Sequence, residues 1–289
     1  MSAVASPIEG EHRRGWFTLL RSTGAPGIAS ATVILAALVL AAVGPLIAPF
    51  DPNLSDLSYA WVGQTGGHLL GFDAQGRDVV SRLFAGARSA MLGPLAVVVI
   101  CMTLGTVTAV SAAWKRGTYD AVVSSGLDVL FAFPGILLAI LAAAVFGPGL
   151  PAASLALAIA YTPYVARVLR GAALRERSQQ YVAALEVQGA SSWSICFRHL
   201  IPNMTPLIVA QATILFGYAM VDLAAISFLG LGVQPPNPDW GVMISENQSG
   251  VIQGYPLAAL SAGLCIVLVV VAFNVLGERL YERAQSERR

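Results

Sequence analysis

Two aspartates in apolar stretches are the residues of this sequence best placed to do chemistry. Asp128 and Asp222 lie within or close to segments long enough to cross a membrane, where a carboxylate at a helix centre costs roughly 2.5 to 3.5 kcal/mol. That cost favours a role in lining a polar cavity, although Asp222 could equally contact a buried partner such as Tyr218. Asp128, about one turn into LDVLFAFPGIL, could instead reach the interface or cap a helix end. Neither aspartate lies in the Gly-x-Gly-Asp pattern of an intramembrane aspartyl protease.

The sequence lacks the other patterns that would indicate a catalytic or metal site. Its single lysine, Lys115, is followed by Arg116 and Gly117, so it has no Gly-Lys-Ser/Thr phosphate loop for ATP. It contains no His-Glu-x-x-His and no Gly-x-Ser-x-Gly. The three cysteines have no motif spacing, which suggests neither a disulfide framework nor a metal site. We therefore predict no catalytic residue, no metal and no cofactor bound by this chain itself.

The composition places the chain in a lipid bilayer. Of its 289 residues, 56% are hydrophobic and only 11% are charged, whereas soluble domains average about 25% charged residues. Because a helix needs roughly 20 mostly apolar residues to cross a membrane, the uncharged stretches predict an all-α membrane protein. Six transmembrane helices are expected at residues 28–49, 91–113, 123–146, 151–170, 206–230 and 256–277. The first uncharged run, 29 residues between Arg21 and Asp51, is too long for a cleaved signal peptide and predicts a retained anchor.

The placement of the basic residues predicts the orientation of these helices. If the amino terminus is cytoplasmic, 14 of the 17 lysines and arginines fall in cytoplasmic segments, which include the tails 1–27 and 278–289. Only Arg77, Arg82 and Arg88 then lie outside, as the positive-inside rule would have it. We therefore expect both termini to be cytoplasmic. The net charge of +1 argues against nucleic acid as a partner and leaves membrane lipid as the medium.

Two polar segments are expected on the outer face. In residues 50–90, Asp78 can cap an amphipathic helix that would lie along the membrane interface or pack against the bundle as an entry helix. Residues 231–255 join a proline-rich piece to Trp240, a residue type suited to the interface. This second segment either frames the mouth of a pathway or closes the last hairpin.

A part-polar segment at residues 181–203 interrupts the apolar blocks on the arginine-rich side. Gly189 can take the positive φ that ends a first short helix, and the serines after it can cap a second helix. That second helix would carry Trp193 and Phe197 four residues apart, and Pro202 would stop it. We call this segment the elbow. Its two short helices, joined at an angle, would make it rigid. Its aromatic side chains could enter a groove of a partner, or the elbow could cover the end of the bundle.

The elbow also carries a family resemblance. Its spacing Y-V-A-A-x-x-x-x-G-A-S followed by R-H-x-x-P-N resembles the cytoplasmic EAA-type loop of ABC importer permeases. The stretches HLLGFDAQGRDVVSRLFAGARSA, LDVLFAFPGILLAI and SFLGLGVQPPNPDWGVMI resemble the dipeptide and oligopeptide permeases of the DppC/OppC type. The resemblance covers nearly the whole chain from the first span onward. It implies the transmembrane domain of a type I ABC importer, with a permease core over residues 91–289 and the coupling loop at 171–205.

The resemblance implies a membrane-spanning subunit of an ATP-driven peptide importer in the bacterial plasma membrane. Such a subunit pairs with a second, related permease of the DppB/OppB type. Two ATPase subunits bind ATP and Mg and dock on the EAA-type loops, and an extracytoplasmic binding protein delivers peptide. The residues expected in the ATPase-coupling loop are Ala183, Ala184, Glu186, Gly189, Ala190, Ser191, Trp193, Phe197, Arg198, His199, Pro202 and Asn203.

The chain departs from the family pattern at two positions of the loop, and one of them is Leu185, where the family commonly has an alanine. Ala183 stands where the family commonly has a glutamate, so any ion pair of that glutamate with the ATPase is lost or moves to Glu186. The runner-up function is an ion-coupled secondary transporter or channel subunit that uses Asp222 and needs no ATPase. Such a protein should show internal repeats, which we do not see in this sequence. Dipeptides, longer peptides, nickel chelates and glutathione remain open as substrates.

Overall fold

The computed structural model describes residues 24–286, with side chains up to residue 282. Most of the predicted amino-terminal tail, with Arg13, Arg14 and Arg21, lies outside the described residues, as do Arg288 and Arg289. The orientation inferred partly from these arginines therefore stays a prediction.

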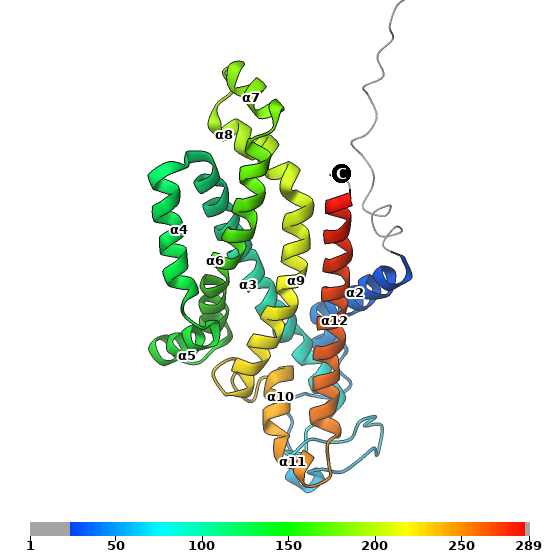
Figure 1. The fold of residues 1–289 in the computed structure, drawn as a ribbon. Coiled ribbons are helices and arrows are strands. Elements are labelled where there is room, and N and C mark those ends of the chain that lie inside the picture. Colours follow the sequence, from blue (N-terminus) through cyan, green and yellow to red (C-terminus); the bar gives the residue numbers. More distant parts are fainter. Residues whose placement is uncertain (1–23, 287–289) are drawn as a thin grey trace, which may run out of the picture.

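The described part of the chain consists of helices joined by loops (Figure 1). The long helices are α2 (Gly24–Ile47), α3 (Val79–Lys115), α6 (Leu150–Arg177), α9 (Ile201–Phe228) and α12 (Leu257–Ser286). The shorter elements are η1 (Leu57–Tyr59), α4 (Gly117–Phe131), α5 (Gly135–Phe146), α7 (Gln180–Val187), α8 (Ser192–Ile195), the π-helical turn η2 (Cys196–Leu200), α10 (Trp240–Glu246) and α11 (Gln248–Ile252). Two isolated bridges are the only β pairing within residues 24–286, so the mostly helical fold is confirmed there.

Five helical segments are long and apolar enough to span a membrane, and a sixth span results if the bent pair α4 and α5 counts as one. The segment expected as a continuous third span is bent by 78° between these two helices. The break lies at Pro134, which directly precedes α5. Proline disfavours helical geometry in the residue before it, which accounts for the end of α4 at this point.

The helix that follows Asp78 does not lie apart from the bundle. It is the beginning of α3, which runs for 37 residues without a break, and Asp78 caps it by accepting a hydrogen bond from Ser81 N. Val79 and Ala87 in its first turns are fully buried. Of the two alternatives, the structure therefore has the entry helix packed on the bundle, because its apolar face meets protein.

Close helix packing holds the bundle together. Helix α3 packs along α2 and α6, α9 packs along α12, and α5 lies against α6 (Figure 1). A Cβ atom added at Gly105 of α3 would lie 2.4 Å from Val165 Cγ1 of α6, and one at Gly277 of α12 would lie 2.6 Å from Ile214 Cγ1 of α9. Small residues at such contacts let membrane helices approach closely. Substituting either glycine would separate the helix pair that it joins.

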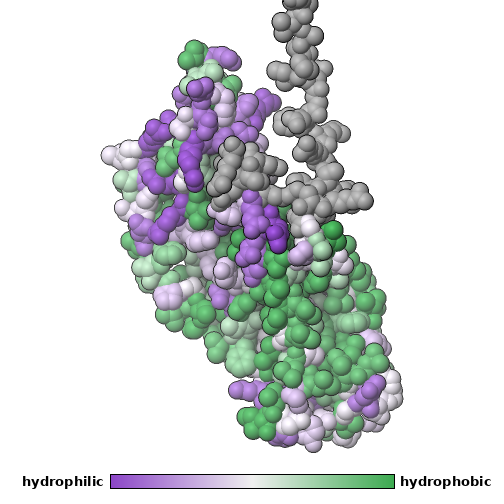
Figure 2. Space-filling model, turned by 45° about the vertical axis from the view of Figure 1, so that its right-hand side comes forward, coloured by the Kyte–Doolittle hydropathy of each residue, from purple (hydrophilic) through white to green (hydrophobic). Residues whose placement is uncertain are grey.

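The surface has an apolar belt between two more polar ends. Figure 2 shows hydrophobic residues over the middle of the molecule and hydrophilic residues gathered mainly toward one end. Large exposed hydrophobic side chains on the long helices include Leu35, Leu38, Val99, Val107, Leu155, Leu260, Leu264 and Val267. Such a belt suits lipid or another apolar chain, and it places the long helices within a membrane.

Candidate functional site

The elbow lies at one end of the bundle, where α6 ends and α9 begins (Figure 1). Gly189 has a φ of +78° and follows α7, as the sequence predicted for a glycine that ends a helix. Ser191 Oγ accepts a hydrogen bond from Ser194 N at 3.2 Å and caps α8. The angle between the two short helices therefore depends on one left-handed glycine and one serine cap.

The second half of the elbow does not stop at Pro202, contrary to the prediction. Helix α8 continues through the π turn η2 into α9, so residues 192–228 form one helical segment. Pro202 lies in the first turn of α9, directly after Ile201, whose N–H donates to Cys196 O across the π turn. The fifth expected span, 206–230, thus begins inside the elbow. Pro202 lies just after the π turn, where the hydrogen-bond register of the helix already changes, so its missing N–H does not end the helix.

One face of the elbow is buried and the other carries exposed aromatic rings. Val182 and Ile195 are buried beneath it. Trp193 is 72% exposed and Phe197 is 44% exposed, with their ring centroids 3.9 Å apart. Together these rings form what we call the aromatic pair. Because exposed aromatic clusters are typical of interaction sites, this face is suited to a protein partner.

The remaining predicted loop residues lie mostly at the surface. Glu186 is exposed and forms no ion pair with another described residue. Ala190 and His199 are half-buried. The other exposed members are Ala183, Ala184, Arg198, Pro202 and Asn203. Val187, at 89% exposure, was not anticipated. Val187 occupies an unspecified position of the quoted pattern, between Ala184 and Gly189. Only its apolar side chain in a part-polar segment could have indicated a contact residue.

A polar contact that the sequence did not reveal fixes the base of the elbow. Tyr181 Oη donates to Glu176 Oε1 at 2.9 Å, and Asn203 Nδ2 donates to the same oxygen at 3.0 Å. Asn203 Nδ2 also lies 3.1 Å from Tyr181 Oη. These three residues, which we call the polar knot, join the end of α6 to α7 and α9. Glu176 is missed by sequence reasoning because its partners are 5 and 27 positions away.

Arg177 makes a second connection at the same place. Its Nη1 donates to Ala113 O at 3.0 Å and to Trp114 O, and its guanidinium lies 4.7 Å from the centre of the Trp114 ring. The carbonyls at the end of α3 have no partner within their own helix. Arg177 therefore supplies them with one and ties the end of α6 to the end of α3.

The two intramembrane aspartates have different surroundings. Asp222 Oδ2 accepts a hydrogen bond from Tyr161 Oη of α6 at 2.5 Å. Tyr218, named above as one possible buried partner, is 58% exposed. The side chain of Asp128 is 64% exposed and pairs with Arg167 Nη2 at 2.6 Å. Asp128 thus fastens α4 to α6 as half of an exposed ion pair.

The opposite end of the bundle contains a buried charge cluster formed by Asp73, Arg77, Arg82 and Glu246. Glu246 Oε2 lies 2.7 Å from Arg77 Nη2 and 3.0 Å from Arg82 Nη2. Arg77, Arg82 and Asp73 are at most 1% exposed. Burial opposes the charge of Arg77, but the hydrogen bonds that it donates to Glu246 and Asp73, with the charges of these carboxylates, outweigh burial and raise the pKa of Arg77. The cluster fastens the start of α3 to α10.

Trp240 does not lie at the membrane interface as expected. It is 2% exposed, and its Nε1 donates to Leu83 O of α3 at 3.0 Å. Asp239 caps α10 by accepting hydrogen bonds from Gly241 N and Val242 N. The indole is drawn inward because its apolar body fills the space between α3 and α10 while its single donor is satisfied.

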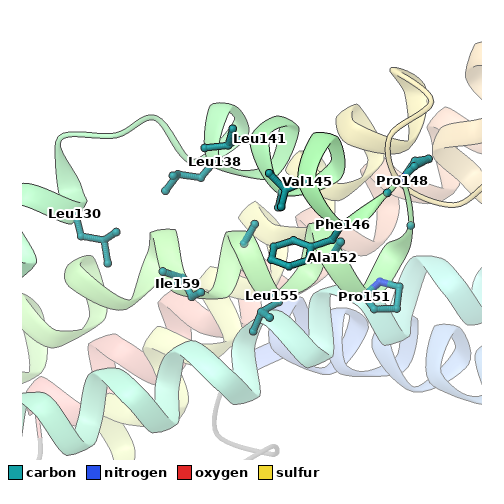
Figure 3. Close-up of a pocket in the computed structure, with 14 residues that line it drawn as sticks. Leu130, Leu138, Leu141, Val145, Phe146, Pro148, Pro151, Ala152, Leu155 and Ile159 are labelled. Atoms are coloured by element: carbon teal, nitrogen blue, oxygen red, sulfur yellow. The ribbon is translucent and has the colours of Figure 1, made fainter.

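A cavity in the membrane-spanning part has neither aspartate in its lining. It has a volume of about 700 Å³ and lies between α5 and α6, close to the bend of the third span (Figure 3). Its lining includes Leu138, Leu141, Val145, Phe146, Leu155 and Ile159, with no charged side chain. An apolar lining of this kind offers nothing to hold a charged or polar ligand. The cavity is therefore not assigned to the transported molecule.

Comparison with known proteins gives a consistent family. Residues 74–287 match the family described as "Binding-protein-dependent transport system inner membrane component". The chain is 36% identical over 269 residues to the glutathione transport system permease protein GsiD of Pectobacterium atrosepticum, covering 93% of this chain and 88% of that protein. It is 37% identical over 242 residues to the dipeptide transport system permease protein DppC of Alkalihalophilus pseudofirmus, covering 81% and 79%.

A solved structure supports the fold. The chain is similar to the inward-facing MetNI methionine ABC transporter, with a TM-score of 0.57 and 20% identity, over 70% of this chain and 96% of that one. This likeness places the helices in the arrangement of a type I ABC importer transmembrane domain. The alternative of an ion-coupled transporter or channel finds no support in these comparisons. The chain belongs to the family of inner-membrane permease components of binding-protein-dependent transport systems.

Proposed function

We propose that this permease imports small peptides and that its elbow docks on a separate ATPase. The observation that carries the proposal is the exposed aromatic pair on a helical segment that continues into α9. A partner that grips Trp193 and Phe197 can move a membrane-spanning helix without an intervening hinge loop. The chain supplies the elbow, and the partner ATPase binds ATP and Mg.

Coupling then follows from the contacts at the base of the elbow. The polar knot holds α7 against the ends of α6 and α9, so displacement of the elbow changes the positions of both helices. If the ATPase pair binds one arrangement of two elbows better than another, ATP binding shifts the permease between two states. Access to the pathway alternates between the two membrane faces as a result.

The partners and orientation complete the proposal. A second, related permease encloses the pathway together with this chain, and an extracytoplasmic binding protein delivers the peptide. The distribution of basic residues supports an orientation with the elbow and both termini in the cytoplasm and the charge cluster on the outer face of the bacterial plasma membrane. Relatives named for glutathione and dipeptide transport support a small peptide as substrate.

Copurification with the ATPase tests the proposal. We expect Trp193→Ala combined with Phe197→Ala to abolish recovery of the ATPase with the permease, because hot-spot aromatics carry much of the binding energy of an interface. Ile252→Ala, at an 85% exposed residue in α11 at the other end, is the matched control and should copurify normally. Equal recovery of the ATPase with both variants would contradict docking at the elbow.

A further inference from the structure

A polar stripe runs along α6 and α9 through the otherwise apolar middle of the bundle. Its members are Tyr161 and Tyr164 on α6 and Gln211, Tyr218 and Asp222 on α9. The α9 residues are seven and four positions apart and share one helix face. Tyr161 Oη donates to Asp222, and Tyr164 Oη donates to Gln211 Oε1 at 3.4 Å. The stripe therefore lies where the two helices meet.

The stripe lies at membrane depth. Asp222 is six residues before the end of α9, or about 9 Å along the helix, and Tyr161 is eleven residues into α6, or about 16 Å. Tyr164 is 39% exposed and Tyr218 is 58% exposed. Polar groups at such depth are costly against lipid. This face is therefore covered by protein or by a water-filled path.

The carboxyl group of Asp222 has no cationic partner among the described side chains. Tyr161 provides one hydrogen bond, but no lysine, arginine or histidine among residues 24–282 forms an ion pair with it. Asp128 differs, because Arg167 already neutralises it. Tyr218 lies one helical turn before Asp222 on the same face. A carboxylate next to an exposed aromatic ring attracts a cationic group through its charge and through the face of the ring.

We infer that Asp222, held by Tyr161 and flanked by Tyr218, binds the ammonium group of the passing peptide. This inference rests on the proposed function, since it needs a substrate that crosses between α6 and α9. A small peptide carries a free ammonium group at its amino terminus, and the site supplies the carboxylate and aromatic surface that such a group prefers. Asp222 is only partly buried, so a passing group can reach it.

Uptake by the complete importer reconstituted in vesicles tests this inference, with dialanine as the probe. Asp222→Asn keeps the shape of the side chain and removes its charge. We expect uptake of dialanine from saturated binding protein to fall about tenfold, the loss of one charge-assisted contact. ATP hydrolysis stimulated by the loaded binding protein should stay within about twofold. Asp222→Glu should recover part of the uptake.

The control is Asp128→Asn, the same chemical change at an aspartate already paired with arginine, which should leave dialanine uptake within about twofold. Unchanged uptake by Asp222→Asn would overturn the inference. A parallel loss of assembly, ATP hydrolysis and uptake would also overturn it, because Asp222 would then pair with the second permease. A wild-type complex that imports no peptide would instead contradict the proposed function itself.

Discussion

The two ends of the bundle are built in opposite ways. At the α10–α11 end, the charge cluster pairs two arginines with two carboxylates of the same chain, three of them almost fully buried. At the elbow end, the aromatic pair and Val187 are left exposed, while the polar knot fixes only the base. Buried charges that are paired within the chain keep a structure in one arrangement, whereas exposed apolar side chains are suited to contact with a partner. We infer that one end holds itself together and that the other is held by another protein.

The largest effect should come from breaking the charge cluster. Arg82→Leu leaves Glu246 and Asp73 buried with one arginine between them. We expect the free energy of unfolding to fall by about 3 to 5 kcal/mol, the cost of an uncompensated buried charge. Thermal unfolding of the purified permease measures this loss. Arg88→Leu, at an exposed arginine of the same helix, should change it little, and equal stability of the two variants would contradict the account.

The next effect concerns Glu176 at the elbow end, where a substitution should alter the coupling of ATP hydrolysis to transport more than it alters folding. Glu176→Ala removes the acceptor shared by Tyr181 and Asn203 and should destabilise the protein by about 1 to 2 kcal/mol. Because the elbow then moves independently of α6, ATP hydrolysed per peptide imported should rise about fivefold or more. Glu176→Gln retains the acceptor oxygen and should restore the ratio. A wild-type ratio in Glu176→Ala would show that the polar knot does not transmit motion.

A smaller effect is expected at the turn of the elbow. Gly189→Ala places a side chain at a φ of +78°, at a cost of about 1 to 2 kcal/mol. Binding of the ATPase should weaken by about fivefold or more, because the angle between α7 and α8 changes. Titration of the ATPase onto the reconstituted permease measures this. Gly171→Ala, in open space on α6, should bind as the wild type does, and equal affinity of both variants would refute the role of the turn.

The smallest effect concerns pH at the α10–α11 end. Burial raises the pKa of Asp239 above its ordinary value of 3.8, although hydrogen bonds such as that from Val242 N lower it. The folded state thus binds this proton more tightly than the unfolded chain, so Asp239 lowers the free energy of unfolding as pH rises above about 4. Asp239→Asn keeps a capping oxygen and should raise the melting temperature slightly at neutral pH. A difference between the two melting temperatures that is independent of pH would contradict this.

The sequence predicted the features that depend on local chemistry. Apolar runs identified the helices, Gly189 identified the turn of the elbow, and Trp193 and Phe197 were expected four residues apart on one surface. Each of these follows from residue type and spacing over a few positions. The roles of the elbow residues in binding an ATPase remain predictions that the experiments above address.

Features that depend on long-range contacts were missed. The sequence around Glu176 does not indicate that Asn203 donates a hydrogen bond to it. The sequence around Trp240 does not indicate that its indole N–H donates to Leu83 O. The second helix of the elbow was expected to end at Pro202, because proline usually stops a helix, but the π turn just before it lets the helix continue. The hydrogen bonds of Glu176 and Trp240 depend on contacts between residues far apart in the chain, which a single sequence does not show directly.

The central claim is that residues 192–228 move as one helical segment when the ATPase acts. Spin labels at Ser192 and Leu229, both exposed near its two ends, report its length in the assembled importer. A second pair, at Ser192 and Val122 on α4, reports its position relative to the rest of the bundle. We predict that ATP binding leaves the first distance unchanged and alters the second. A change in the first distance with none in the second would contradict the account, because the elbow would then bend without moving α9.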